Sequence, residues 1–262
     1  MPQEGYRAAA FFDFKGGNGV EGKTVQKRIM LDPRLQKCAD FVRAGVRIAD
    51  VGTDHGYLPI ALLQSGKASF ASVTDIHAAP LESARRNAEK YGVAGRMRFL
   101  LSDGLHGISP QEADDIVIAG MGGELILRIL SEAPWLRTST KHLILQPMTT
   151  AAQLRHGLSA QGFSIDREEA VFDGKKIYSV LSVFYTGETS VNPPSRFVHM
   201  GEIRPGSPYS ARYAQSVLHN LENKCRGILH AGGDASELRA AICEIRRLYL
   251  TDDLEEEIRD ES

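Results

Sequence analysis

Apolar residues follow two periods along the chain from residue 32 onward, and these periods predict its helices and strands. Short apolar runs such as VRIADVG, at residues 46–52, are typical of buried parallel strands. Runs of the same kind predict further strands at 70–76, 97–104, 115–120 and 142–147. Apolar residues at helical spacing predict helices at 33–42, 58–66, 80–93, 123–133 and 150–162. This alternation predicts a doubly wound α/β domain with a parallel sheet and right-handed crossovers.

The next two strand-like runs predict a different ending for the sheet. FSIDREEAVF, at 163–172, and KKIYSVLSVFY, at 175–185, are separated only by Asp173-Gly174. An Asp-Gly pair between two apolar runs is a strong signal for a two-residue hairpin turn. We therefore expect a parallel sheet that finishes in an antiparallel hairpin.

Composition divides the chain into five segments, and the α/β domain is one of them. The first is rich in glycine and proline and is expected to be a loosely structured extension, whereas the last is acidic. Two helical stretches, 209–229 and 235–249, flank HAGGD and predict a small helical hairpin. The segments are a poorly structured extension at 1–29, the α/β domain at 30–186, a linker at 187–206, the helical hairpin at 207–250 and an acidic tail at 251–262.

Charge and cysteine content narrow the class of protein. The 262 residues carry a formal net charge of −2, so a polyanionic partner would need a local basic patch. The three cysteines are an odd number without a C-x-x-C pair, which argues against disulfides and against a zinc site. The sequence shows no run of eighteen apolar residues and no secretory pattern. We therefore expect a cytoplasmic protein that needs neither a membrane nor a metal, and that is a monomer or a weak dimer.

Candidate chemistry follows the predicted strands, because ligands of a doubly wound sheet bind where its strands end. The first strand leads into Asp50-Val-Gly52-Thr-Asp54, which is not the G-x-G-x-x-G of dinucleotide enzymes. An acid in that turn would repel a pyrophosphate but suits a cationic ligand. The second strand ends in Asp75, placed to accept hydrogen bonds from a ribose diol, and the third in Ser102-Asp103-Gly104. Together these acids predict a site for S-adenosylmethionine, although a single Asp after a strand is more often a helix cap.

Residues 17–24, GNGVEGKT, match the phosphate-binding loop G-x-x-x-x-G-K-[ST]. Such a loop needs a long helix after it, and here Pro33 follows Thr24 by only nine residues. We interpret the match as accidental. Whether translation naturally begins at Met30 stays open.

Three blocks, DVGTDHGYLP, IVIAGMGGELI and LILQP, occur in that order along the chain. In this respect the chain resembles the bacterial tRNA (adenine-22-N1)-methyltransferase family, over roughly residues 31–250. Family members often have Q-P-N where this chain has Gln146-Pro147-Met148. The resemblance implies a Rossmann-like methyltransferase domain with a helical hairpin, which transfers a methyl group from S-adenosylmethionine to N1 of adenine 22 in tRNA.

The resemblance also implies roles for residues of the predicted site. Asp54 and His55 are the expected catalytic residues, Asp54 as the acceptor for the adenine amino group. The expected cofactor-binding residues are Asp50, Gly52, Gly56, Asp75, Asp103, Gly104, Gly120 and Met121. The expected substrate-binding residues are Tyr57, Gly122, Gly123, Gln146, Arg204 and Arg212. Two alternatives stay open: a methyltransferase for another RNA or a small molecule, and a non-catalytic RNA-binding protein with this fold.

Overall fold

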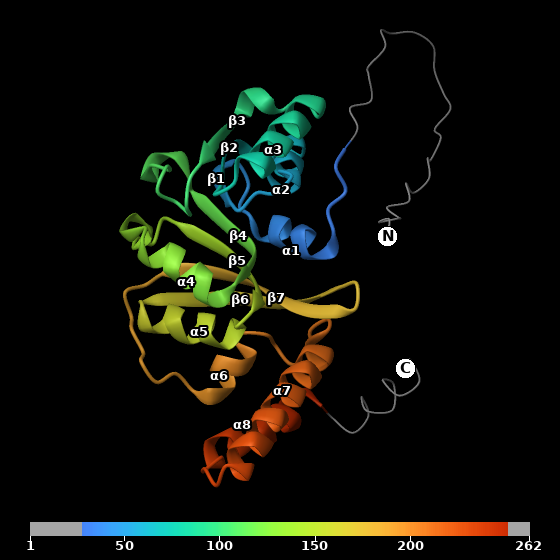
Figure 1. Ribbon diagram of the computed structural model, residues 1–262, viewed down its shortest axis with the longest axis vertical. Helices are drawn as coiled ribbons and strands as arrows, with labels where there is room; N and C mark the ends of the chain where they lie inside the picture. Colours follow the sequence, from blue (N-terminus) through green and yellow to red (C-terminus); the bar gives the residue numbers. More distant parts are fainter. Residues whose placement is uncertain (1–27, 251–262) are drawn as a thin grey trace, which may run out of the picture.

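A seven-stranded sheet forms the centre of the protein in a computed structural model that describes residues 28–250 (Figure 1). Its strand order is β3-β2-β1-β4-β5-β7-β6. Strands β1 to β5 are parallel, whereas β7 is antiparallel to both β5 and β6. The predicted Rossmann-like sheet with a terminal antiparallel hairpin is confirmed. The strands are β1 (Val46–Val51), β2 (Ala68–Asp75), β3 (Met97–Leu101), β4 (Asp115–Gly122), β5 (His142–Thr149), β6 (Phe163–Asp173) and β7 (Lys176–Tyr185).

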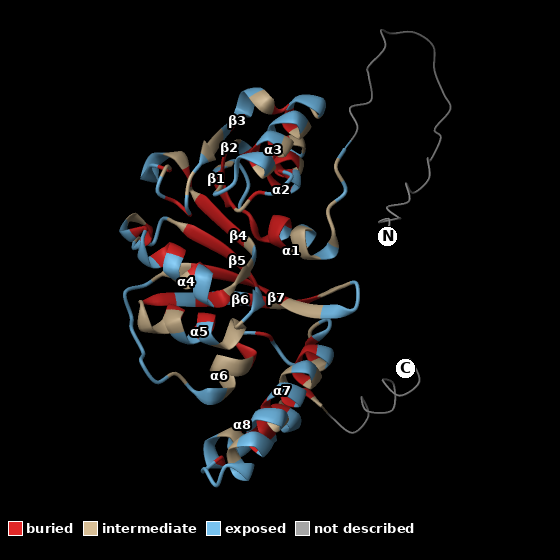
Figure 2. Cartoon of the chain, in the orientation of Figure 1, coloured by how far each residue is buried: buried red, intermediate tan, exposed pale blue. Residues whose placement is uncertain are grey.

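Helices cover both faces of the sheet, because neighbouring strand residues point to opposite sides. Ile48 of β1 belongs to an apolar cluster with α1, α2 and α3, whereas its neighbour Ala49 belongs to a cluster with α4 and α5. The strands between these layers are the most deeply buried part of the chain (Figure 2). These helices, which match the predicted ones, are α1 (Pro33–Phe41), α2 (Tyr57–Gln64), α3 (Ala78–Lys90), α4 (Gly123–Ser131) and α5 (Ala151–Ala160). Three 3-10 turns lie at Ala94–Arg96, Pro110–Glu112 and Pro134–Leu136.

The hairpin turn between β6 and β7 lies one residue later than predicted. Asp173 still pairs with Lys176 in the ladder, so the two loop residues are Gly174 and Lys175. Gly174 adopts a φ of +62°, which glycine reaches without steric cost and which the first loop position requires. The shift leaves Lys175 at the exposed tip of the hairpin.

Beyond the sheet, the chain forms a short helix and then the predicted helical hairpin. Helix α6 (Ser195–Met200) lies within the segment expected as a linker, where it packs against α5 and α8. Helices α7 (Ser210–His230) and α8 (Ser236–Tyr249) pack together as predicted. Their shared core includes Leu221, Ile242 and Ile245. The extension at 1–27, which contains the phosphate-loop match, and the acidic tail lie outside the described residues.

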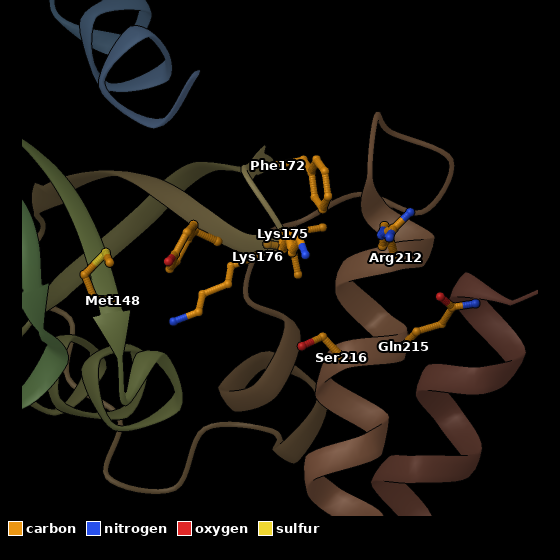
Figure 3. A pocket seen from close by; sticks show the side chains of 9 residues that line it. Met148, Phe172, Lys175, Lys176, Arg212, Gln215 and Ser216 are labelled. Carbon is orange, nitrogen blue, oxygen red and sulfur yellow. The ribbon is translucent and has the colours of Figure 1, made fainter. Parts of the chain in front are cut away.

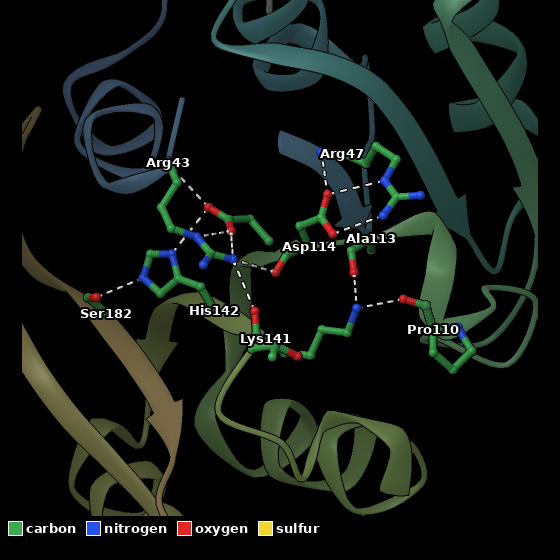
Figure 4. A network of polar contacts seen from close by, with 10 residues as sticks. Arg43, Arg47, Pro110, Ala113, Asp114, Lys141, His142 and Ser182 are labelled. Atoms are coloured by element: carbon green, nitrogen blue, oxygen red, sulfur yellow. Dashed lines mark hydrogen bonds and ion pairs between the residues drawn. The ribbon is translucent and has the colours of Figure 1, made fainter. Parts of the chain in front are cut away.

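A polar network closes the amino ends of the strands (Figure 4). His142 lies between Asp115 and Ser182, with Nδ1 3.1 Å from Asp115 Oδ2 and Nε2 2.7 Å from Ser182 Oγ. Burial alone would raise the pKa of Asp115, but hydrogen bonds from His142 and Arg43 outweigh it and hold that pKa below its usual value. The order Ser–His–Asp is that of a hydrolase triad, yet all three side chains are buried. The network therefore joins β4, β5 and β7 and offers no nucleophile to a substrate.

A second buried network attaches the helical hairpin to the sheet. Arg155 of α5 and Glu168 of β6 are both buried, and Arg155 Nη2 lies 2.6 Å from Glu168 Oε1. The same guanidinium donates to the carbonyl of His199 in α6, at 2.8 Å, and to Tyr213 Oη in α7, at 2.7 Å. A Cβ on Gly201 would lie 1.8 Å from Glu168 Oε2, so only glycine fits beside the pair. One side chain thus connects elements on four parts of the chain.

Removing one partner of this pair should destabilise the fold strongly. Arg155→Met would leave the Glu168 carboxylate buried without its cation, which costs about 3–5 kcal/mol in the free energy of unfolding. The double variant Arg155→Met/Glu168→Leu removes both charges and should be more stable than Arg155→Met alone. Urea unfolding of the three proteins measures both differences. A loss of less than about 1 kcal/mol in Arg155→Met would contradict the role given to the pair.

Candidate active site

The carboxyl ends of the parallel strands meet at one edge of the sheet, opposite the network around His142. The chain order reverses between β1 and β4, since β2 and β3 lie on one side of β1 and β5 on the other. A crevice for ligands opens at such a switch point in open α/β sheets. The residues predicted to bind cofactor or substrate lie at this edge, in the ends of the strands and in the loops and helix starts that follow them, with Arg204 and Arg212 as the exceptions.

The loop after β1 has an unusual backbone that presents Asp54 to solvent. Gly52, Asp54 and Gly56 all have left-handed backbones, with φ of +73°, +48° and +70°. A left-handed conformation is ordinary for glycine but costs about 1 kcal/mol for other residues. The Asp54 side chain is 72% exposed. The left-handed backbone therefore holds this carboxylate in solvent beside the crevice. Strain of this kind is concentrated at functional sites.

Gly52 also brings the loop after β1 into contact with the carboxyl end of β4. A Cβ at this position would lie only 2.3 Å from Cε of Met121, so a larger residue would displace the Met121 side chain. Met121, predicted to bind the cofactor, therefore packs its thioether against the β1 loop. Gly56 leaves little room for a side chain, because a Cβ added there would lie 3.0 Å from Ala84 in α3.

His55 is oriented by contacts on three sides. Its Nδ1 lies 3.0 Å from Ser83 Oγ on α3, and its Nε2 lies 3.6 Å from Asp54 Oδ2. Its ring stacks on Tyr57 with 5.4 Å between the centroids. The His55 carbonyl accepts from Asn87 Nδ2 at 2.9 Å, which ties the loop to α3. Asp54, His55 and Tyr57 thus form one exposed group beside the crevice.

Asp50 is the buried acid of the site. It accepts a hydrogen bond from Thr53 Oγ1 at 2.6 Å. Burial raises its pKa to about 6; the bond from Thr53 lowers the pKa, and the nearby charge of Asp75 raises it further. A cationic ligand nearby would stabilise the ionised form of this carboxyl group and so lower its raised pKa.

Asp75, at the end of β2, stands between two exposed apolar side chains. Its Oδ1 accepts from the backbone N–H of His77 at 2.8 Å, which leaves Oδ2 for a ligand. Ile76 and Leu101 are 60% and 65% exposed, although they follow or end buried strands. An acceptor beside apolar surface fits a nucleoside, whose ribose diol donates and whose base is flat. The sequence did not single out either apolar residue; for Ile76 the signal was its place directly after the strand-ending acid, Asp75.

Asp103 forms an ion pair within the protein, with Arg128. Arg128 of α4 donates to both of its oxygens, at 2.9 and 3.1 Å, and these bonds lower its pKa against the effect of desolvation. Each carboxylate oxygen keeps one further lone pair for a ligand. The carbonyl of the adjacent Gly104, a residue with a φ of +58°, accepts a hydrogen bond from Thr74 Oγ1 at 2.9 Å.

Gln146, predicted to bind substrate, has its side-chain amide held by hydrogen bonds within the protein. Its Oε1 accepts from Arg34 Nη1 at 2.7 Å and from the N–H of Gly120 at 3.0 Å, and its Nε2 donates to the carbonyl of Pro147. Two donors on one oxygen fix which end of the amide faces α1. Gly120 occupies a bulge in β4 with a φ of +81°. Arg34, which the sequence did not single out, therefore ties α1 through Gln146 to the carboxyl ends of β4 and β5.

The remaining predicted residues separate into two groups. Gly122 and Gly123 pack closely on the loop after β5, where a Cβ on Gly123 would lie 2.5 Å from the Thr150 carbonyl. Arg212 and Arg204 do not lie among the loops of the edge: Arg212 of α7 stacks on Phe172, and Arg204 is exposed in the segment before α7. Among residues 28–250 no cluster of three metal-ligating side chains occurs, and none of the helices there could span a membrane.

Comparisons with known proteins agree with this geometry. A family model described as a methyltransferase domain matches residues 31–181. The tRNA (adenine(22)-N(1))-methyltransferase of Bacillus subtilis is 38% identical over 153 residues, which cover 58% of this chain and 64% of that protein. The sequence match thus spans less than two thirds of that relative.

Two solved structures match more of the chain. One, a putative tRNA (m1A22) methyltransferase of Streptococcus pneumoniae in complex with S-adenosyl-L-methionine, has a TM-score of 0.71 and 31% identity, over 82% of this chain and 99% of that chain. The other, the B. subtilis m1A22 tRNA methyltransferase, has a TM-score of 0.68 and 29% identity, over 84% and 96%. The chain belongs to the tRNA (adenine-22-N1)-methyltransferase family, within the methyltransferase-domain fold.

Proposed function

We propose that this protein transfers a methyl group from S-adenosylmethionine to N1 of adenine 22 in tRNA. One observation carries the proposal: three adjacent parallel strands bring carboxylates to one edge, beside a strained loop that exposes Asp54. Family membership supplies the target base and position. Acting on tRNA would place the protein in the cytoplasm.

The residues at this edge fit the proposed cofactor. When bound, S-adenosylmethionine supplies a methyl group already activated by its sulfonium. Asp75 would accept from the ribose diol, while Ile76 and Leu101 offer apolar surface to the adenine ring. Asp50 and Asp54 suit a cationic ligand and would repel the pyrophosphate of a dinucleotide.

The residues beside the crevice can position the target adenine. N1 is engaged in a base pair, so the base has to be unpaired or turned out before it reacts. The exposed ring of Tyr57, stacked on His55, offers a surface for that base. Asp54 would accept from the adenine amino group and stabilise the positive charge that develops on the ring. The remaining requirement is alignment, which Arg34 and Gln146 support by fixing the carboxyl ends of β4 and β5.

Mass spectrometry of tRNA nucleosides tests the proposed function in cells. Cells that contain the protein should have 1-methyladenosine at position 22, and cells from which it has been removed should lack it. Methylation of another RNA would instead support the first alternative. Tight tRNA binding without any methyl transfer would support the alternative of a non-catalytic RNA-binding protein.

Asp54→Asn should impair the reaction more than binding. Asparagine tolerates the left-handed backbone but loses the charge and half of the acceptor capacity. We expect kcat to fall about 100-fold or more, with little change in tRNA affinity. Single-turnover methylation and separate binding titrations measure the two effects. The exposed Asp166→Asn serves as a control with the same chemical change, and normal methylation by Asp54→Asn at saturating cofactor would remove Asp54 from catalysis.

The buried acid should make cofactor binding depend on pH. Asp50, with a pKa of about 6, is largely protonated at pH 5 and ionised at pH 7. A cation favours the ionised form, so affinity for S-adenosylmethionine should rise about tenfold from pH 5 to pH 7. Calorimetry at several pH values measures this rise, and Asp50→Asn should abolish it. An equally steep rise in Asp50→Asn would assign the effect to another group.

Arg34 should act as a positioning residue. Arg34→Met removes the donor that holds Gln146, so kcat should fall about tenfold while cofactor affinity stays within about twofold. Arg34→Lys keeps one donor and should recover part of kcat. Steady-state kinetics and cofactor titrations separate the two effects, with the exposed Arg96→Met as control. An equal fall in kcat in Arg34→Lys and Arg34→Met would show that the hydrogen bond donated to Gln146 does not support the reaction.

A further inference from the structure

A groove runs between the β6–β7 hairpin and helix α7 and reaches the carboxyl end of β5. It consists of two adjoining pockets of about 490 and 860 Å³, which share Met148, Ile177, Tyr178 and Ser216. Figure 3 shows the first pocket, with Lys175 and Lys176 on the hairpin side and Arg212, Gln215 and Ser216 on α7. The groove therefore has one wall from the β6–β7 hairpin and α5, and one wall from α7 of the helical hairpin.

The lining of the groove is basic on both walls. Lys175, Lys176 and Arg212 line the first pocket and Lys224 the second, and neither lining includes an Asp or a Glu. None of these four cations has an ion pair among residues 28–250, whereas Arg128 is paired with Asp103. In a chain with a net charge of −2, four cations without carboxylate partners form a local positive field.

Two details support a positive potential within the groove. Burial lowers the pKa of His199, which lines the second pocket, and the charges of Arg155 and Lys224 lower it further. The Arg212 guanidinium lies over the Phe172 ring, 4.8 Å from its centroid. Stacking restrains this side chain and leaves its N–H groups available to an anion.

The groove is continuous with the active edge through β5. Met148, which lines both pockets and is 38% exposed, follows Pro147 and Gln146. Gln146 in turn holds Gly120 at the end of β4. A polymer bound in the groove would therefore extend towards the loops that border the crevice.

We propose that this groove binds the sugar–phosphate backbone of the RNA substrate, with Lys175, Lys176, Arg212 and Lys224 contacting phosphates. The proposal rests on the proposed function in so far as RNA is the methyl acceptor. Cations on two walls fit a backbone that carries a negative charge at every nucleotide, and the elongated double pocket fits a polymer better than a small molecule. An acidic protein segment is the competing occupant, which the experiment below separates from RNA.

The test compares two triple variants with the same loss of charge. The groove variant is Lys175→Gln/Lys176→Gln/Arg212→Gln. The control is Lys90→Gln/Arg96→Gln/Arg137→Gln, at exposed positions near the amino ends of β3 and β5. Fluorescence anisotropy with a labelled tRNA transcript gives affinity at several salt concentrations, and calorimetry gives S-adenosylmethionine affinity as a check of the fold.

We expect the groove variant to bind tRNA at least about tenfold more weakly than the wild type, with a salt slope smaller by about 2. Its affinity for S-adenosylmethionine should match that of the control variant. Equal tRNA affinity and salt slope in the two triple variants would overturn the proposal. So would poly-L-glutamate binding to the wild-type protein as tightly as tRNA.

The same experiment keeps this inference separate from the proposed function. A wild-type protein that binds tRNA through the groove without methylating it would refute the function and support the groove. A wild-type protein that methylates tRNA, alongside a groove variant that binds like the control, would refute the groove and support the function.

Discussion

The buried pair of Arg155 and Glu168 is the interaction on which the arrangement of the two parts of the molecule depends. A lone buried charge is costly, so each partner is tolerated only where the other lies within bonding distance. The remaining N–H groups of Arg155 donate to His199 in α6 and to Tyr213 in α7. The guanidinium therefore has all these hydrogen bonds only when the helical hairpin is docked. Since α7 forms one wall of the basic groove, this network helps to hold the groove in shape.

The active edge follows a different constraint, which is the geometry of parallel strands. All five parallel strands end at the same edge, so acids far apart in the sequence come together without specific contacts between them. Left-handed turns at Gly52, Asp54 and Gly120 then aim short polar side chains and bare backbone at the crevice. In physical terms the site combines anionic acceptors for a cationic nucleoside with an exposed carboxylate for the target base. Such an arrangement favours alignment and charge stabilisation over nucleophilic chemistry.

The sequence predicted the sheet, most helices and the loops of the active edge, because each depends on local periodicity and on where strands end. It did not predict contacts between distant side chains. Arg34 and Gln146 are 112 residues apart, and no local pattern shows that their side chains meet. The pairing of Asp103 with Arg128 and the basic groove depend in the same way on tertiary packing. The hairpin turn was misplaced by one residue because Gly174 can occupy either loop position, and the ladder of β6 and β7 decides between them.

The most direct test of this account uses two tRNA transcripts that differ only at position 22. Purified protein, S-adenosylmethionine and either transcript are combined, and the methylated nucleoside is identified and located by mass spectrometry of nuclease fragments. The account predicts about one methyl group per transcript with adenine at position 22, as 1-methyladenosine at that position, and none on the transcript with guanine there. Equal methylation of both transcripts, or a methyl group on the adenine amino nitrogen, would contradict it.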